Sequence, residues 1–358
     1  MKPSFGLLCD RAPRRAGRAL ALVLGGLLAG GCSDDALECE VNENIVHLNA
    51  GAASVHDPAI IKVGDTYYVY SSSDLGSFHT SNDMRDWAHA GQVFEEIPRW
   101  LLEEIPAAAH IGSPDISYYR GRYLLFYQSH KSATCNAATG LATNTTLDPE
   151  DPDYAWIDHG QILRSKPYFE SVEIICGDDQ AIFNAIDAHF FEDLDGTPWL
   201  AIGSTIGGIK LIELDPETLM PLAGGEYFSL AERFLLQPDP VIEAAFILFR
   251  HGYYYLFLSF NHCCKGEETR YQVRVGRSKA LTGPYYDREG WPLAWGGGTL
   301  VIDRDGALIG TGHSDVFSEK GADWLVHHAK HAEQDYRPYL NIRKIEWDEA
   351  LWPSVCRS

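Results

Sequence analysis

The chain has 358 residues, of which 45% are hydrophobic and 22% charged, a composition that is ordinary for a globular protein and argues against disorder. Its formal net charge of −21 at pH 7 argues against a nucleic-acid partner. The same acidity argues against a polyanionic substrate unless the binding site is locally basic.

The first segment is typical of an export signal. A cluster of arginines precedes an apolar run at residues 19–28 that is too short to span a bilayer, and small residues precede Cys32. We predict a lipoprotein signal peptide at residues 1–31, a lipid anchor at Cys32 and a tether at residues 32–44. The alternative is an ordinary signal peptide cleaved nearby. In both cases the domain is exported, either lipid-anchored in the bacterial cell envelope or secreted, and it meets a membrane only through the anchor.

Cysteines of an exported protein can form disulfides. Cys39 and Cys356 lie near the two ends of the mature chain, and a bond between them would close a ring-shaped fold. Besides Cys9 and Cys32 the chain has six cysteines, which allow fifteen pairings, and among these we single out Cys39–Cys356. The adjacent Cys263 and Cys264 form either a vicinal disulfide or two buried thiols, and their spacing does not decide between these alternatives.

The rest of the chain repeats one pattern five times. Each copy has a short apolar strand, a turn rich in Gly or Asp, and a strand rich in aromatic residues, which predicts a β-hairpin. The distance along the chain from one copy to the next leaves room for a four-stranded sheet with its loops. We therefore predict an all-β, five-bladed β-propeller over residues 45–358. The copies begin at Asp57, Asp115, Asp187, Glu243 and His313.

These five polar residues are expected to meet at one mouth of the central channel, because the innermost strand of each blade lines that channel. Clustered carboxylates are costly to bury and repel one another. The alternative to a functional role is that they solvate a wet channel. Glycoside hydrolysis needs one carboxylic acid and one carboxylate on opposite sides of the bond, and a third carboxylate raises the pKa of the acid. The cluster therefore predicts a glycosidase without assigning the roles.

Four segments resemble the signature segments of glycoside hydrolase family 43, in its arabinanase branch. They are Val55–Pro58, Asn184–Asp187, Ile242–Ala244 and Val275–Ser278. The likeness extends over residues 46–353. It implies a five-bladed propeller that inverts the anomeric centre, with Asp57 as general base, Asp187 as the group that modulates the pKa of the acid, and Glu243 as general acid.

The resemblance also implies a cation in the channel and no organic cofactor. His313 matches the position where arabinanases have a histidine beside a channel cation, commonly calcium, held mostly through water. The alternative is a polar channel residue bonded to a carboxylate. His56, Asp115 and Arg277 are second candidates for substrate binding or for support of the site. We expect His56 to orient the first site strand, Asp115 to add charge or bind substrate, and Arg277 to form a salt bridge with an inner carboxylate or elsewhere.

The sequence departs from the arabinanase pattern at its sugar-stacking positions, where Gly112 and Thr205–Ile206 replace aromatic residues. The reaction type is therefore better supported than the substrate. We predict endo cleavage of α-1,5-arabinan, a plant cell-wall polysaccharide. The alternatives are an exo-acting α-L-arabinofuranosidase, a β-xylosidase, and a surface lipoprotein that binds polysaccharide without cleaving it. A long acidic insertion at residues 144–180 is placed to cover the active mouth.

Overall fold

The computed structural model describes residues 45–47, for which only the backbone is considered, and residues 54–357 apart from 170, 235 and 237. Four predictions concern residues outside the described part of the chain. They are the signal peptide, the tether, the lipid anchor at Cys32 and the disulfide partner Cys39. No helix in the described part of the chain is long and apolar enough to cross a membrane.

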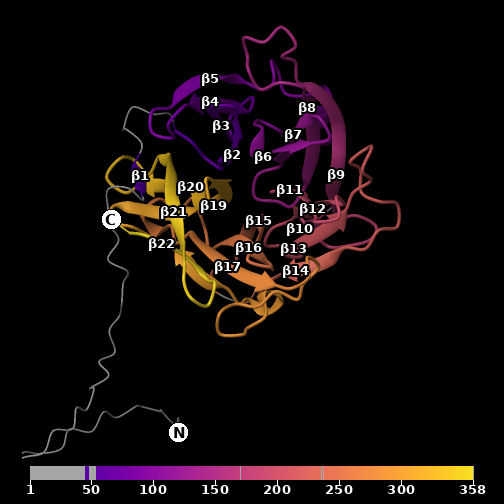
Figure 1. Ribbon diagram of the computed structural model, residues 1–358. Coiled ribbons are helices and arrows are strands. Elements are labelled where there is room, and N and C mark those ends of the chain that lie inside the picture. Colours follow the sequence, from indigo (N-terminus) through magenta and orange to yellow (C-terminus); the bar gives the residue numbers. More distant parts are fainter. Residues whose placement is uncertain (1–44, 48–53, 170, 235, 237, 358) are drawn as a thin grey trace, which may run out of the picture. The chain divides into compact units, whose positions relative to one another are not determined.

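The described residues form five antiparallel sheets around a common centre, which confirms the predicted five-bladed β-propeller (Figure 1). The first strand of each blade lies innermost. From the centre outward, blade 1 contains β2 (Ala59–Val63), β3 (Thr66–Ser71), β4 (Ser77–Ser81) and β5 (Ala88–Gln92), and blade 2 contains β6 (Gly112–Tyr119), β7 (Arg122–His130), β8 (Ala137–Asn144), β9 (Ile157–Phe169) and β10 (Val172–Gly177). Blade 3 contains β11 (His189–Glu192), β12 (Pro198–Ile202), β13 (Ile209–Glu213) and β14 (Phe228–Ala231). Blade 4 contains β15 (Ile242–Arg250), β16 (Tyr253–Phe260), β17 (Gln272–Ser278) and β18 (Thr299–Ile302). Blade 5 contains β19 (Leu308–Glu319), β20 (Ala322–His331), β21 (Pro338–Trp347), β22 (Pro353–Val355) and β1 (Ile45–His47). The short helices are α2 (Arg99–Glu104), η1 (Gly266–Glu268) and η2 (Leu293–Trp295).

Three of the inner hairpins share a two-residue turn that ends in glycine. The turns are Arg120–Gly121, His251–Gly252 and Lys320–Gly321, and all six residues have φ between 47° and 85°. Two successive left-handed residues make the hairpin turn whose twist matches that of the flanking strands. The glycine of each repeated sequence pattern therefore helps to fix the register of its blade.

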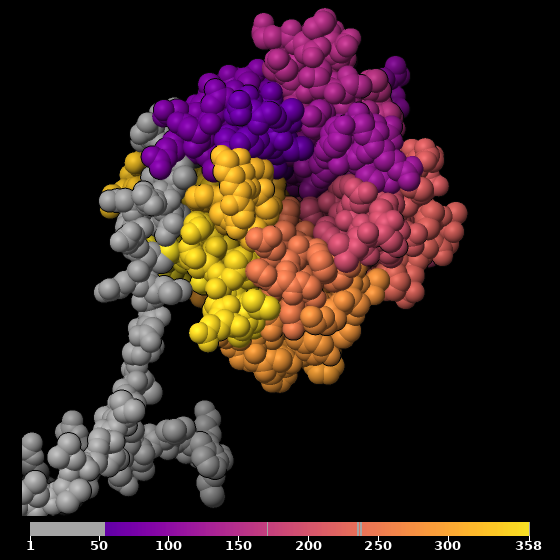
Figure 2. Space-filling model, viewed as in Figure 1, coloured from indigo at the N-terminus to yellow at the C-terminus, as the bar shows by residue number. Residues whose placement is uncertain are grey.

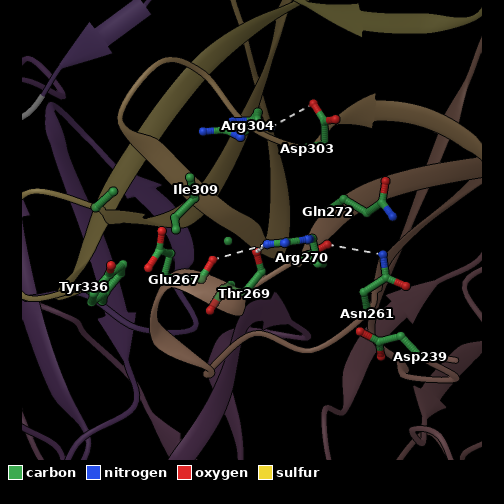
Figure 3. Close-up of a pocket in the computed structure, with 12 residues that line it drawn as sticks. Asp239, Asn261, Glu267, Thr269, Arg270, Gln272, Asp303, Arg304, Ile309 and Tyr336 are labelled. Atoms are coloured by element: carbon green, nitrogen blue, oxygen red, sulfur yellow. Dashed lines mark hydrogen bonds between the residues drawn. The ribbon is translucent and has the colours of Figure 1, made fainter.

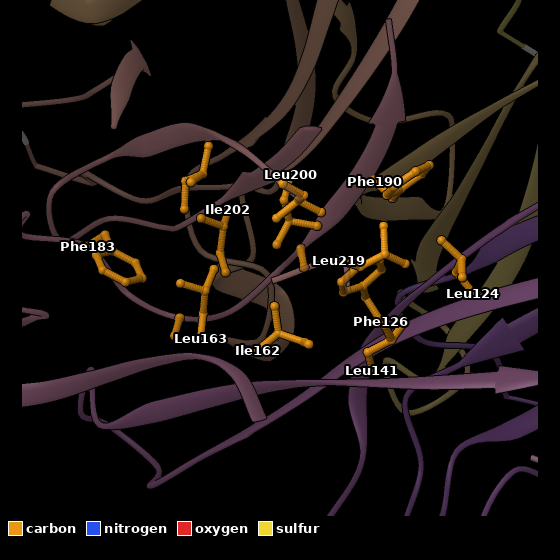
Figure 4. Close-up of a cluster of buried hydrophobic side chains, with 14 of the residues drawn as sticks. Leu124, Phe126, Leu141, Ile162, Leu163, Phe183, Phe190, Leu200, Ile202 and Leu219 are labelled. Atoms are coloured by element: carbon orange, nitrogen blue, oxygen red, sulfur yellow. The ribbon is translucent and has the colours of Figure 1, made fainter. Parts of the chain in front are cut away.

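Apolar side chains fill the space between neighbouring blades. In one cluster, Leu124 and Phe126 of β7 pack with Phe190 of β11 and Leu200 of β12, and each is at most 5% exposed (Figure 4). A strand that is covered on both faces needs no alternation of apolar and polar residues. This explains why a middle strand such as Tyr253–Phe260 is apolar or aromatic at every position except Ser259.

The insertion at residues 144–180 contains all of β9 and all of β10, and β10 is a fifth strand on blade 2. A disulfide between Cys135 and Cys176 ties β10 to the loop before β8. At the base of this hairpin, the Ser165 hydroxyl accepts a hydrogen bond from the backbone N–H of Ala185 at 2.9 Å. The insertion therefore supports the segment that leads to Asp187.

Both ends of the described domain close the ring on one strand, because β1 and β22 pair with successive stretches of the same edge of β21. Arg343 of β21 is fully buried. Its guanidinium donates to Asp305 Oδ2 at 2.9 Å and to the carbonyl of Cys356 at 2.8 Å. Cys356 is disulfide-bonded, and its predicted pairing with Cys39 stays a prediction because Cys39 lies outside the described residues.

We expect the substitution Arg343→Met to lower the free energy of unfolding by about 3–5 kcal/mol, because it leaves the buried Asp305 carboxylate without its guanidinium partner. Urea denaturation followed by tryptophan fluorescence measures the change. The matched control is Arg99→Met, which breaks the ion pair between Arg99 and Glu103. The Arg99 side chain is 91% exposed, so its loss should matter little. Equal transition midpoints for Arg343→Met and the unmodified protein would contradict a role of this pair in ring closure.

Candidate active site

One residue in each blade has a left-handed backbone where the chain enters the innermost strand at the channel mouth. The five are Asp57, Ser113, Asp187, Ala244 and His313, with φ of 53°, 41°, 55°, 55° and 50°. A positive φ is uncommon for residues other than glycine and often marks a functional site. These residues are the structural equivalents among the blades. The predicted first residues were therefore wrong by two positions in blade 2, where Asp115 was chosen, and by one in blade 4, where Glu243 was chosen.

A second ring of residues lies two positions further along each inner strand, deeper in the channel. It contains Ala59, Asp115, His189, Phe246 and Asp315, most of which line a cavity of about 270 Å3. In the space-filling view, the surface of the molecule is hollowed at the centre, where the blades meet (Figure 2). Asp115 bonds to His189 Nδ1 at 2.8 Å and accepts the backbone N–H of Phe190 at 3.1 Å. Asp115 therefore joins blades 2 and 3 one layer below the left-handed residues, and it lines a small cavity together with Asp187 and His313. Its predicted role in adding charge or binding substrate stays a prediction.

Three histidines surround the carboxylate of Asp57. Its oxygens lie 3.2 Å from His313 Nδ1, 3.4 Å from His56 Nδ1 and 3.5 Å from His328 Nδ1. The Ser72 hydroxyl donates to Asp57 Oδ2 at 2.6 Å. Burial opposes ionisation of Asp57, but the three histidines and Ser72 favour it more strongly, so the pKa of Asp57 is lowered. Asp57 is thus held as a carboxylate, the form that a general base needs.

Asp187 and Glu243 have the opposite character. Burial raises the pKa of Asp187, and the nearby Asp57 adds to this, although His313 and the N–H of Ala244 oppose it. Asp187 Oδ2 accepts that N–H at 3.1 Å, which ties blade 3 to blade 4. Burial and the charge of Asp187 raise the pKa of Glu243 to about 8. Glu243 therefore keeps its proton near neutral pH, as a general acid must.

Sequence reasoning missed two residues that connect these carboxyls. The Tyr271 hydroxyl, on the loop before β17, donates to Glu243 Oε1 at 2.8 Å. His328 on β20 accepts the backbone N–H of Asp57 at 3.2 Å, and its ring stacks on Tyr271 and on His56 with centroid distances of 5.6 and 4.4 Å. Both residues lie outside the repeated leading positions, so the repeat gave no signal for them.

We expect Tyr271→Phe to move the alkaline limb of the pH–rate profile upward. The hydrogen bond from Tyr271 lowers the pKa of Glu243, so its removal raises that pKa above about 8 and keeps the acid protonated to higher pH. The profile of kcat/KM measures this, since it reports the free enzyme. Tyr285→Phe is the matched control, because Tyr285 is equally buried and donates to the carbonyl of Leu281 in blade 4. A downward shift in Tyr271→Phe would contradict the assignment.

A directly bound calcium ion needs six to eight oxygen ligands. Among the described residues, His56, Asp57 and His328 have potential ligand atoms within 4.8 Å of one another. Two imidazoles and one carboxylate do not fit calcium as a directly bound ion. A calcium ion held through water stays a prediction, and no catalytic step is assigned to it.

Arg277 lies at the far end of β17, away from the mouth. Its guanidinium donates to the carbonyl of Ala350 at 2.7 Å and stacks on Tyr253 and Trp352, both at 4.3 Å. The expectation that Arg277 pairs with an inner carboxylate was wrong. It holds the outer parts of blades 4 and 5 together.

A polar cavity of about 750 Å3 lies beside the loops of blades 4 and 5 (Figure 3). It is lined by residues that precede β15, follow β16 and precede β19, including Asp239, Asn261, Arg270 and Asp303. Tyr271, which bonds to Glu243, directly follows Arg270 in the chain. The cavity is therefore close to the carboxyl cluster and offers hydrogen-bonding groups of both signs.

At the mouth of the propeller, the pKa of Asp57 is lowered and the pKa of Glu243 is raised. This pair of carboxyls on a β-propeller identifies the protein as a glycoside hydrolase. A model of Glycosyl hydrolases family 43 matches residues 51–353, and the chain belongs to this family.

Known relatives fit this family membership. The chain is 35% identical to the extracellular exo-α-(1→5)-L-arabinofuranosidase ArbA of Cellvibrio japonicus, with 86% of this chain and 87% of that protein covered. It is 33% identical to the extracellular endo-α-(1→5)-L-arabinanase 1 of Bacillus subtilis, with coverages of 84% and 87%. The structure of the Cellvibrio cellulosa α-L-arabinanase complexed with arabinohexaose is similar, with a TM-score of 0.77, 34% identity and coverages of 85% and 95%.

Proposed function

We propose that the protein is an exported, inverting glycosidase that cleaves α-1,5-linked arabinan, and that it acts as an endo-arabinanase. The observation that carries this proposal is the pair of opposite pKa shifts at the mouth. The pKa of Asp57 is lowered and that of Glu243 is raised to about 8, which sets one carboxyl as base and the other as acid at neutral pH.

In this mechanism Asp57 takes a proton from a water molecule while the water oxygen attacks the anomeric carbon. Glu243 gives its proton to the leaving glycosidic oxygen on the opposite side of the sugar, and the configuration at the anomeric carbon is inverted. Asp187 does not take up or give the transferred protons. Its charge keeps Glu243 protonated, and its hydrogen bond with Ala244 holds the backbone next to the acid in place.

The proposed substrate rests on the relatives, whose names include both endo and exo enzymes acting on α-1,5-linked arabinose. The endo form is proposed because the relatives include the extracellular endo-α-(1→5)-L-arabinanase 1 of Bacillus subtilis. Export is supported by the two extracellular relatives. The lipid anchor at Cys32 and attachment to the cell envelope are part of the same proposal.

Product chromatography on debranched arabinan tests the function. An endo enzyme releases a ladder of oligosaccharides from the start, whereas an exo-acting arabinofuranosidase releases one small product throughout. Parallel reactions with xylan test the β-xylosidase alternative. Binding of arabinan without any product after prolonged incubation would overturn the proposal in favour of a polysaccharide-binding surface protein.

A further inference from the structure

The disulfide between the adjacent Cys263 and Cys264 stands beside the carboxyl cluster. Cys264 Sγ lies 3.8 Å from His56 Nε2 and accepts a contact from Lys330 Nζ at 3.0 Å. The other ring nitrogen of His56 faces Asp57. A single imidazole ring therefore separates the sulfur atoms from the proposed general base.

The loop that presents the disulfide is fixed by hydrogen bonds at both ends. The Thr269 hydroxyl donates to the carbonyl of Cys263 at 3.2 Å and accepts the backbone N–H of Lys265 at 3.0 Å. His262, next to the pair, bonds to Asp239 at 2.6 Å. The sulfur atoms therefore occupy a defined place instead of moving with a free loop.

This place has the properties of a sugar-binding surface. Cys264 is exposed, and a disulfide presents a polarisable, apolar surface of two sulfur atoms. His56 and Lys330 place polar nitrogen atoms at its border. Sugars are bound by apolar surfaces that cover their C–H faces together with a few polar groups that meet their hydroxyls. The sequence lacks aromatic residues at two expected stacking positions, Gly112 and Thr205–Ile206, so the need for another apolar surface is clear.

The position of the loop also fits the path of a polymer. On one side the loop contacts His56, and on the other its residues Glu267, Thr269 and Arg270 line the 750 Å3 cavity (Figure 3). The loop that carries the disulfide therefore reaches from His56, beside the carboxyl cluster, to the cavity.

We propose that the Cys263–Cys264 disulfide is the surface on which a sugar unit of the substrate packs, next to the unit whose anomeric carbon is attacked by the water molecule that Asp57 activates. The proposal rests on the function proposed above and names a binding position of that same site. It makes Cys263 and Cys264 determinants of substrate affinity, with the chemistry left to the carboxyls.

Reduction of the disulfide tests this position without a mutation. Dithiothreitol transfers two electrons and two protons to the pair, which becomes two thiols, while the reagent closes to its cyclic disulfide. Cys264 is exposed, whereas the other described disulfide cysteines, Cys135, Cys176 and Cys356, are at most 3% exposed. We therefore expect mild reduction under native conditions to be selective for the vicinal pair. Alkylation and mass spectrometry confirm which bond is open. A chelator that binds zinc much more tightly than calcium is present throughout, because the two thiols and His56 have ligand atoms within 4.8 Å of one another and would bind zinc. The predicted channel calcium ion is left in place by this choice.

We expect the KM for arabinan to rise by about fivefold to tenfold, with kcat little changed. A change of this size corresponds to the loss of one or two methylene-sized apolar contacts with the sugar. The double variant Cys263→Ser/Cys264→Ser is expected to have, without reductant, the same raised KM as the reduced enzyme. Its KM should not change when dithiothreitol is added. The matched control is the unmodified protein incubated with the cyclic, oxidised form of dithiothreitol, for which we expect an unchanged KM.

An unchanged KM in the selectively reduced enzyme would overturn the proposal. So would a fall in kcat at constant KM, which would indicate that the disulfide positions His56 and Asp57 instead of binding sugar. Absence of any arabinan hydrolysis by the unmodified, oxidised protein is a different result, because it would reject the proposed function itself. If the serine variant fails to fold, the reduction experiment alone decides.

Discussion

Asp57→Asn is expected to reduce kcat on arabinan by about 10²- to 10⁴-fold, the usual contribution of a general base. Asparagine has nearly the same shape as aspartate, but its amide cannot take a proton from water. It also tolerates the left-handed backbone that Asp57 adopts, with φ of 53°, better than alanine does. The amide oxygen can still accept the hydrogen bond from Ser72. The variant should therefore fold normally and bind substrate.

The control for Asp57→Asn is Asp315→Asn, another buried aspartate on an inner strand. Asp315 lies in the deeper ring and accepts the backbone N–H of Ile60 at 2.8 Å, which an asparagine oxygen can also do. We expect kcat of Asp315→Asn to be little changed. Initial rates at saturating arabinan, with circular dichroism to verify folding, measure both variants. Similar losses in the two would show that the mouth ring has no special role and would reject Asp57 as the base.

Glu243→Gln is expected to lose a similar factor on arabinan but far less on an aryl arabinoside. The leaving group from arabinan is an alcohol, which needs the proton that Glu243 holds through its pKa of about 8. A nitrophenolate leaving group is stable as an anion and leaves without that proton. The loss on the natural polymer should therefore exceed the loss on the nitrophenyl arabinoside by at least an order of magnitude.

The measurement for Glu243→Gln is kcat/KM on both substrates, side by side. Glu192→Gln, at the exposed far end of β11, is the control for the same chemical change away from the site. Equal losses on the two substrates would mean that Glu243 acts in binding or folding, and the assignment as general acid would have to be withdrawn.

The repeat in the sequence was enough to predict the propeller, because strand, turn and aromatic strand recur with their turn glycines. It located the mouth correctly only in blades 1, 3 and 5, where the left-handed position is occupied by Asp57, Asp187 and His313. In blades 2 and 4 this position holds Ser113 and Ala244, which have no charge to reveal them. The prediction therefore moved to the nearest carboxyl.

Other parts of the site have no local signal in the sequence. His328 lies on the second strand of blade 5, and its contact with the backbone of Asp57 joins residues 271 positions apart. Arg277 looked suitable because it is a cation in a family-like segment, but β17 runs from the mouth outward and places it at the wrong end. Such errors arise because the sequence pattern predicts that a residue lies on a strand but does not predict at which end of the channel it lies.

The closure of the ring on β21 has a consequence for how the protein acquires its structure. β1 is the first strand of the described domain, yet its partner β21 lies almost at the end of the chain. During synthesis the N-terminal strand has no edge to pair with until nearly the whole domain has emerged. Contacts between such distant segments form slowly, and unpaired strand edges are prone to aggregate in the meantime. Completion of the last blade is therefore expected to be the late, rate-limiting event of folding.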